Sequence, residues 1–153
     1  MICKQALWPR GRARGSAAPR ARSNPVQRIL VVDDDLAIRE LSTTVLTNSG
    51  YDVDTAEDGA AAWQALNADG YDLMITDQNM PKLTGVELLE KLRAARMDMP
   101  VILATGALPA EAFSRSPWLQ PTATLLKPFT IEELLGMVKA IVGAAHFNSG
   151  AII

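Results

Sequence analysis

Polar residues suited to phosphate or metal chemistry follow four separate apolar runs of this 153-residue chain. They are Asp33-Asp34-Asp35, Asp77, Thr105 and Lys127. Carboxylates that share a crevice repel one another, and the repulsion raises their pKa values unless a cation is present. Because the candidate ligands are all oxygen atoms, with no Cys or His among them, they indicate a hard ion such as Mg²⁺.

The same residue types can carry out phosphoryl transfer. A carboxylate beside Mg²⁺ can attack a phosphoryl donor and form an aspartyl phosphate. The transferring group carries negative charge on its oxygens, and a divalent ion, a lysine ammonium and a threonine hydroxyl each stabilise part of that charge. The residues therefore predict phosphoryl chemistry, provided that the fold brings them together.

Short apolar runs alternate with amphipathic helical patterns from residue 28 onward. The runs predict strands that are mostly buried on both faces, and apolar residues at about 3.6 spacing predict helices. The predicted strands cover residues 28–33, 51–56, 71–76, 100–104 and 122–126. The predicted helices cover residues 36–48, 58–70, 86–95, 109–118 and 131–142, and the fourth is weak because Pro109 and Pro117 bound it. In the first helix, the inward face is predicted to hold Leu36, Leu41, Val45 and Leu46.

This alternation predicts an α/β fold, in which helices cover both faces of a parallel sheet. Ligands of such sheets bind outside the carboxyl ends of the strands. The polar residues named above stand at those ends, so one shared site is predicted there.

Five motifs, in order and at the usual spacing, resemble the receiver domain of two-component response regulators. They are ILVVDDD at residues 29–35, ITDQNMP at 75–81, Gly85, ATG at 104–106 and KPF at 127–129. The resemblance covers about residues 28–143. It implies a flavodoxin-like, doubly wound, five-stranded parallel sheet of order 2-1-3-4-5.

The resemblance also implies a role for each site residue. Asp77 is similar to the phosphoacceptor, Asp34 to the direct Mg²⁺ ligand and Asp33 to the acid that holds the ion mainly through water. The implied metal ligands are therefore Asp33, Asp34, Asp77 and the backbone carbonyl of Asn79. Thr105 resembles the switch hydroxyl and Lys127 the lysine that pairs with the phosphoryl oxygens, with a cis bond expected between Lys127 and Pro128. Thr124 departs from the pattern, because many receivers carry Tyr or Phe there, and this calls the usual aromatic coupling to the output face into question.

The charge distribution divides the chain into three predicted parts. Residues 1–27 carry six basic residues and no acid, whereas the remainder carries nine basic and 17 acidic residues, a net charge of −8. We expect a disordered basic extension over residues 1–27, a receiver domain over 28–143 and a tail over 144–153. Lys4 and five arginines give the extension the composition of an organelle transit peptide or of a segment that touches nucleic acid or anionic lipid. A plain unstructured extension fits the same residues and is favoured.

Composition also limits the setting. No apolar run approaches the ~20 residues that would span a bilayer, so no membrane insertion is expected. Cys3 is the only cysteine, which excludes a disulfide framework and favours a reducing, cytoplasmic environment.

The resemblance implies a single-domain response regulator that acts as a switch and not as an enzyme, beyond self-catalysed phosphorylation and dephosphorylation. A sensor histidine kinase or a histidine phosphotransfer protein would supply the phosphoryl group, and a downstream protein target would read the switch. A homodimer through the fourth and fifth helices is also compatible with the resemblance, although the fourth helix is weak. Nucleic-acid binding would rest on the basic extension alone.

Three alternatives remain open from the sequence. The chain could be a phosphate-sink or relay receiver cut from a hybrid kinase. It could also be a phosphohydrolase similar to the haloacid dehalogenases, with Asp33 as nucleophile and Asp35 as acid. Finally, the acids could cap the following helix, a role that is favoured for Asp35 in particular.

Overall fold

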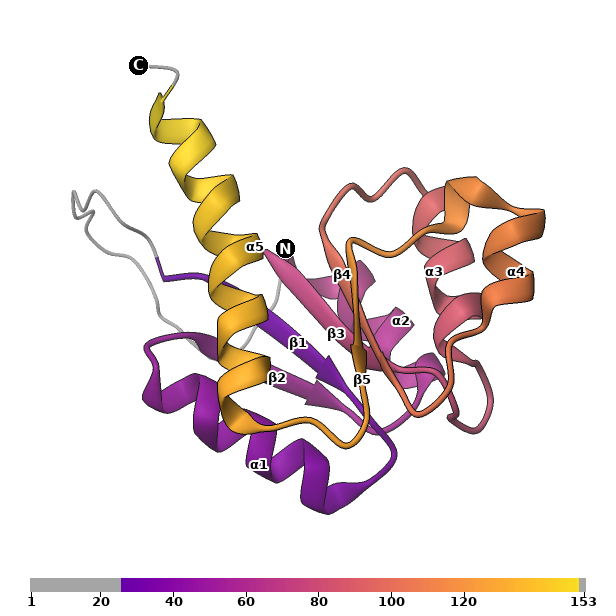
Figure 1. Ribbon diagram of the computed structural model, residues 1–153, viewed down its shortest axis with the longest axis horizontal. Helices are drawn as coiled ribbons and strands as arrows, with labels where there is room; N and C mark the ends of the chain where they lie inside the picture. Colours follow the sequence, from indigo (N-terminus) through magenta and orange to yellow (C-terminus); the bar gives the residue numbers. More distant parts are fainter. Residues whose placement is uncertain (1–25, 152–153) are drawn as a thin grey trace.

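The computed structural model describes the backbone of residues 26–151 and the side chains of residues 26–143, and within that range strands and helices alternate (Figure 1). The strands are β1 (Arg28–Val32), β2 (Asp52–Ala56), β3 (Leu73–Asp77), β4 (Val101–Thr105) and β5 (Ala123–Leu126). The helices are α1 (Leu36–Asn48), α2 (Gly59–Ala68), α3 (Gly85–Ala94), α4 (Ala110–Arg115), the short 3₁₀ turn η2 (Pro117–Leu119) and α5 (Ile131–Ala151).

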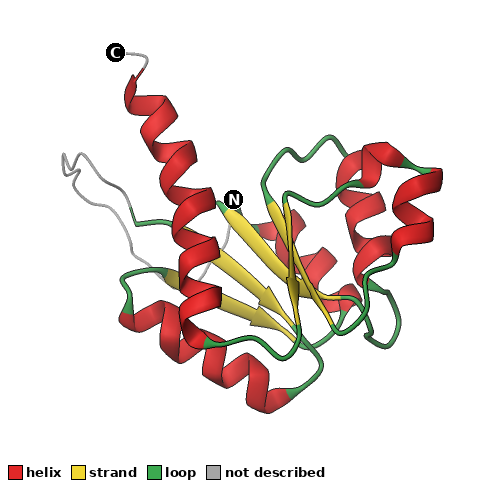
Figure 2. Cartoon of the chain, viewed as in Figure 1, coloured by secondary structure: helices red, strands yellow, loops and turns green. Residues whose placement is uncertain are grey.

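The five strands form one parallel sheet in the order β2-β1-β3-β4-β5, as the resemblance implies. Successive residues of a strand point to opposite faces of the sheet, so β1 supplies both hydrophobic cores. Ile29 and Val31 pack in the core beneath α1 and α5, whereas Leu30 and Val32 pack in the core beneath α2 and α3. Figure 2 shows the resulting helix–sheet–helix layers. All five carboxyl ends of the strands therefore lie at one edge of the sheet.

Two predictions about helices need correction. The last helix does not end at Val142 but continues to Ala151, so most of the predicted tail over 144–153 is helical. Residues 144–149 contain no proline and begin with two alanines, which favour helix continuation over a stop at Gly143. The sequence predicts disorder for residues 1–27, and residues 1–25 of this extension lie outside the described residues, as do residues 152–153 at the end of the tail.

The inward face of α1 also differs from the prediction. Leu46 is fully buried, but Leu36 and Leu41 are 57% and 50% exposed. Leu41 stands five residues before Leu46, which places it about 140° away around the helix axis. The buried stripe instead contains Ser42, four residues before Leu46. The apolar residues of α1 are thus split between the core and the surface.

The fourth helix is as weak as its two prolines predict. It has only six residues, and among the described side chains none caps its start. Phe113 and Leu119 are buried and attach α4 and η2 to the core beneath α2 and α3. Within residues 26–151, none of the helices has the length and apolar character that crossing a membrane requires.

Gly85 allows α3 to begin directly against the end of β3. Its amide donates to the carbonyl of Gln78 at 3.0 Å, and a Cβ at this position would lie 2.5 Å from the backbone oxygen of Asp77. We expect Gly85→Ala to lower the free energy of unfolding by about 1–3 kcal/mol, because backbone atoms must shift to admit the methyl group.

Urea unfolding measures this effect, and Gly136→Ala in α5 is the matched control. A Cβ at Gly136 has no neighbouring heavy atom within 4 Å among the described residues. The control is expected to stabilise the helix by about 0.5–1 kcal/mol. Equal effects of the two substitutions would contradict the close approach at Gly85.

Candidate functional site

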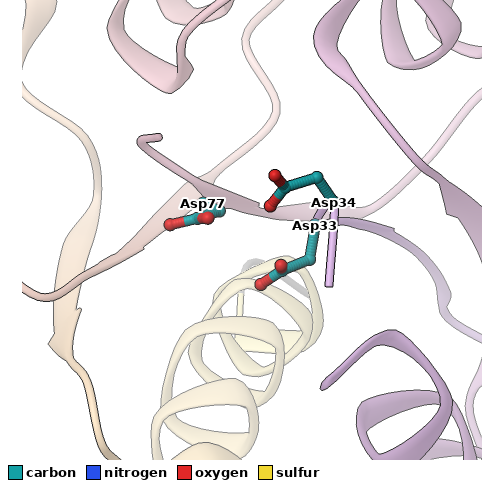
Figure 3. Close-up of side chains that lie close together, drawn as sticks. All are labelled: Asp33, Asp34 and Asp77. Carbon is teal, nitrogen blue, oxygen red and sulfur yellow. The ribbon is translucent and has the colours of Figure 1, made fainter. Parts of the chain in front are cut away.

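Three carboxylates meet at the edge formed by the carboxyl ends of the strands. Asp33 and Asp34 follow β1, Asp77 ends β3, and each offers an oxygen within 4.8 Å of the others (Figure 3). Asp33 and Asp77 are buried, whereas Asp34 is exposed. The set fits a hard divalent cation, because it supplies only oxygen ligands and one of them is open to solvent. These are the three side-chain ligands that the sequence predicts.

Lys127 reaches the same carboxylates from the end of β5. Its Nζ lies 2.9 Å from Oδ2 of Asp33 and 3.4 Å from Oδ1 of Asp77. The backbone amide of Lys127 donates to the carbonyl of Thr105 at 2.9 Å, and the bond to Pro128 is cis, as expected. The lysine is thus anchored beside β4 and presents its ammonium to two of the three acids.

The electrostatics of this group follow from its burial. Burial raises the pKa of Asp77, the charge of Lys127 opposes this rise, and the charge of Asp33 adds to it. For Lys127, burial disfavours the ammonium, but the hydrogen bond to Asp33 and the charges of Asp33 and Asp77 outweigh it, so its pKa is raised. The ammonium of Lys127 thus offsets part of the negative charge of Asp33 and Asp77.

The raised pKa of Asp77 predicts a pH dependence of stability in the absence of divalent cations. A carboxyl that is harder to ionise in the folded state favours folding at low pH, and this contribution is lost as pH rises from the usual value of 3.8 through the raised pKa. Wild type should therefore lose stability relative to Asp77→Asn over this acidic range. At neutral pH the variant should be the more stable protein.

Urea unfolding in EDTA at a series of pH values compares the two proteins. The two curves should converge below the usual pKa, where Asp77 is protonated in both states. Parallel curves would show that Asp77 ionises as easily in the folded chain as in the unfolded one.

Thr105 ends β4 and is fully buried. Its Oγ1 donates to the carbonyl of Ala107 at 2.9 Å and accepts from the amide of Ala107 at 3.3 Å. The structure thus places the predicted switch hydroxyl at the edge of the site, bound to the loop that leads into α4. Thr124 lies on β5 beside Leu103 of β4, and no aromatic ring stands at that position.

Asp35 does not join the site. Its Oδ1 accepts from the amides of Ala37 and Ile38 at 2.9 and 3.3 Å, so it is the N-cap of α1. This confirms the capping role. It also opposes a phosphohydrolase in which Asp33 and Asp35 act as a pair, because the carboxylate of Asp35 accepts hydrogen bonds from the amides at the start of α1.

Two contacts of the site were not predicted. Arg39 donates from Nη1 to the carbonyl of Asp33 at 2.6 Å, and the side-chain oxygen of Gln78 accepts from the amide of Val86 at 2.8 Å. Arg39 lies six residues after Asp33, on α1, and Gln78 follows the phosphoacceptor position directly. Neither residue type stands out in its sequence context, so only the fold reveals these contacts.

Comparison with known proteins agrees with the geometry. The family described as "Response regulator receiver domain" matches residues 29–139. The chain is 36% identical over 126 residues to the "Response regulator MprA" of Mycolicibacterium vanbaalenii, which covers 81% of this chain and 54% of the relative. It is 39% identical over 118 residues to the "Transcriptional regulatory protein CpxR homolog" of Haemophilus influenzae, covering 76% of this chain and 50% of the relative. The chain thus spans about half the length of these curated relatives.

Solved structures show the same likeness. The chemotaxis response regulator CheY4 of Vibrio cholerae superposes with a TM-score of 0.69 at 30% identity, over 76% of this chain and 99% of that one. The response regulator TrrA of Thermotoga maritima, solved in complex with Mg²⁺ and BeF, gives a TM-score of 0.67 at 37% identity, over 76% of this chain and 99% of that one. From its fold, its site and these relatives, the chain belongs to the response regulator receiver domain family of two-component signalling.

Proposed function

We propose that this receiver domain accepts a phosphoryl group on Asp77 in a Mg²⁺-dependent reaction, and that the transfer switches a surface that binds a partner protein. The observation that carries the proposal is the contact of one ammonium, that of Lys127, with the carboxylates of both Asp33 and Asp77 inside the acidic cluster. A site built for phosphate needs this combination of hard-cation ligands and a fixed positive charge.

Different residues of this chain would bind the cation, attack the phosphoryl group and bind its oxygens. Asp33, Asp34, Asp77 and the backbone carbonyl of Asn79 would hold Mg²⁺, which neutralises carboxylate and phosphoryl charge when it is bound. An Oδ of Asp77 attacks the phosphorus of a phosphohistidine, the O–P bond forms, and the P–N bond breaks. The imidazole leaves with the electron pair of that bond and takes up a proton. Lys127 then stays in place and pairs with a phosphoryl oxygen.

Thr105 links this reaction to the surface in the proposed switch. A hydroxyl has one hydrogen, and here that hydrogen is donated to the carbonyl of Ala107. If it is donated instead to a phosphoryl oxygen on Asp77, the carbonyl of Ala107 must find another partner. The loop from Ala107 to α4 would then rearrange, and the weakly capped α4 offers little resistance.

The proposed donor is a sensor histidine kinase or a histidine phosphotransfer protein, and the proposed reader is a downstream protein target. The receiver domain family and the name of one relative, a response regulator, support this kind of partner. The chain is proposed to act in the cytoplasm as a switch, with no turnover beyond its own phosphorylation and dephosphorylation. A phosphate sink or relay uses the same chemistry and differs only in its partners.

Mass spectrometry of the intact chain after incubation with acetyl phosphate tests the proposal. With Mg²⁺ we expect a gain of one phosphoryl group that is labile to base, because an acyl phosphate hydrolyses readily. With EDTA in place of Mg²⁺ the gain should disappear. Labelling that is independent of Mg²⁺, or that survives base, would contradict the proposed aspartyl phosphate.

A further inference from the structure

The loop between β3 and α3, residues 78–84, is held at two separate places. At its base, Gln78 and Gly85 share a backbone hydrogen bond of 3.0 Å. Near its tip, Nζ of Lys82 lies 3.2 Å from Oδ2 of Asp58, which precedes α2. The side chain of Asp58 is 7% exposed and that of Lys82 is 65% exposed, so a buried carboxylate holds an otherwise solvated lysine.

The start of α2 also approaches the loop backbone very closely. A Cβ at Gly59 would lie 2.4 Å from Cβ of Leu83 and 2.6 Å from the carbonyl oxygen of Leu83. Lys82 itself has a φ of 72°, which a residue with a side chain rarely adopts unless its surroundings impose it. The loop therefore packs closely against the start of α2, and this packing holds Lys82 in a backbone conformation that is unfavourable in an isolated loop.

The two carboxylate oxygens of Asp58 allow it to cap α2 and to bind Lys82 at the same time. Its Oδ1 accepts from the amide of Ala61 at 2.8 Å, and its Oδ2 is left for Lys82. The hydrogen bond from Ala61 lowers the pKa of Asp58; burial opposes this, and Lys82 adds to the lowering. One carboxylate thus caps α2 and binds the loop at once.

The anchored loop carries Asn79, whose carbonyl is the proposed fourth metal ligand. We propose that Asp58 and Lys82 are positioning residues for the cation site: their contact, together with the close approach at Gly59, fixes the loop that carries the Asn79 carbonyl. This inference rests on the proposed function, because it assumes that a divalent cation binds at the acidic cluster. Neither residue would touch the ion.

Asp58 and Lys82 carry opposite charges, so variants of the two residues distinguish a positioning role from a purely electrostatic effect on the bound cation. If only the electrostatic field mattered, Lys82→Met would tighten Mg²⁺ binding and Asp58→Asn would weaken it. If the contact positions the loop, both variants should weaken binding, by about twofold to fivefold, the scale of one partly exposed ion pair. Asn caps helices as well as Asp does, so Asp58→Asn leaves the start of α2 intact.

Mg²⁺ titrations followed by the NMR amide shifts of Asp77 and Asn79 measure the affinity directly. Lys82→Arg should restore wild-type affinity, and Lys139→Met removes the same charge from the exposed surface of α5 as a matched control. In the acetyl phosphate assay, the Mg²⁺ concentration for half-maximal labelling should rise in Lys82→Met, while the rate at saturating Mg²⁺ stays within about twofold. Gly59→Ala should shift the amide of Asn79 even before Mg²⁺ is added.

The outcomes separate this inference from the proposed function. If Lys82→Met binds Mg²⁺ as tightly as wild type, or more tightly, the positioning role is wrong while the phosphoacceptor site stands. If wild type itself shows no Mg²⁺-dependent shift of Asp77, the proposed function fails and this inference fails with it.

Discussion

Asp77→Asn is expected to abolish phosphoryl labelling by acetyl phosphate, with a loss of more than about a thousandfold in rate. The amide is nearly the same size as the carboxylate but is a poor nucleophile, so no aspartyl phosphate can form. The contact between Lys127 and Asp33, at 2.9 Å, does not involve Asp77 and should persist. The loss would then report the missing nucleophile and not a collapsed site.

The matched control for this substitution is Asp35→Asn. Asp35 belongs to the same stretch of acids but caps α1, and Asn can accept the same amide hydrogen bonds. The control should be labelled at the wild-type rate, as followed by intact-mass spectrometry. Undiminished labelling of Asp77→Asn would place the phosphoryl group elsewhere. If the protein hydrolysed a phosphate ester, and Asp33→Asn but not Asp77→Asn abolished that turnover, the phosphohydrolase alternative would be favoured.

Lys127→Met is expected to change Mg²⁺ affinity and the rate of phosphoryl transfer in opposite directions. The ammonium of Lys127 competes with a cation for the carboxylates of Asp33 and Asp77, since it lies 2.9 and 3.4 Å from them. Its removal should therefore tighten Mg²⁺ binding. Labelling at saturating Mg²⁺ should nevertheless slow by about a hundredfold, because a preorganised charge on the transferring phosphoryl group is lost.

Two measurements on the same variant check this division. NMR titration gives the Mg²⁺ affinity, and the rate of mass gain with acetyl phosphate gives the transfer step. Lys139→Met serves again as the control of equal charge, and neither quantity should change in it. Slower labelling that more Mg²⁺ fully restores would assign Lys127 a role in metal binding alone.

The sequence by itself determined the fold and the membership of the site. Every strand except β2 is a short apolar run, and each of the critical residues ends such a run or follows it within two positions. Its place at a strand end is therefore a local property of the sequence. Once the strands are parallel, all their carboxyl ends share one edge of the sheet. Because β1 neighbours β3 and only β4 lies between β3 and β5, Asp34, Asp77 and Lys127 come together although up to 93 positions separate them.

The tertiary structure alone decided how the site residues divide their contacts. Asp33, Asp34 and Asp35 are chemically identical neighbours, yet one binds Lys127, one is exposed and one caps a helix. The direction in which the chain leaves β1 sets these differences, and that direction depends on how α1 packs on the sheet. The sequence favours the cap at Asp35, but a pattern of residue types does not show which of Asp33 and Asp34 contacts Lys127.

The same limit explains the contacts that sequence reasoning missed. Asp58 and Lys82 stand in two different loops, and only the packing of α2 beside α3 brings them to 3.2 Å. The burial of Leu46 and the exposure of Leu41 likewise depend on how α1 is rotated against the sheet. Local sequence determines which residues stand at strand ends, because strand formation is a local choice, whereas pairing across loops and helix rotation are decided by packing between distant segments.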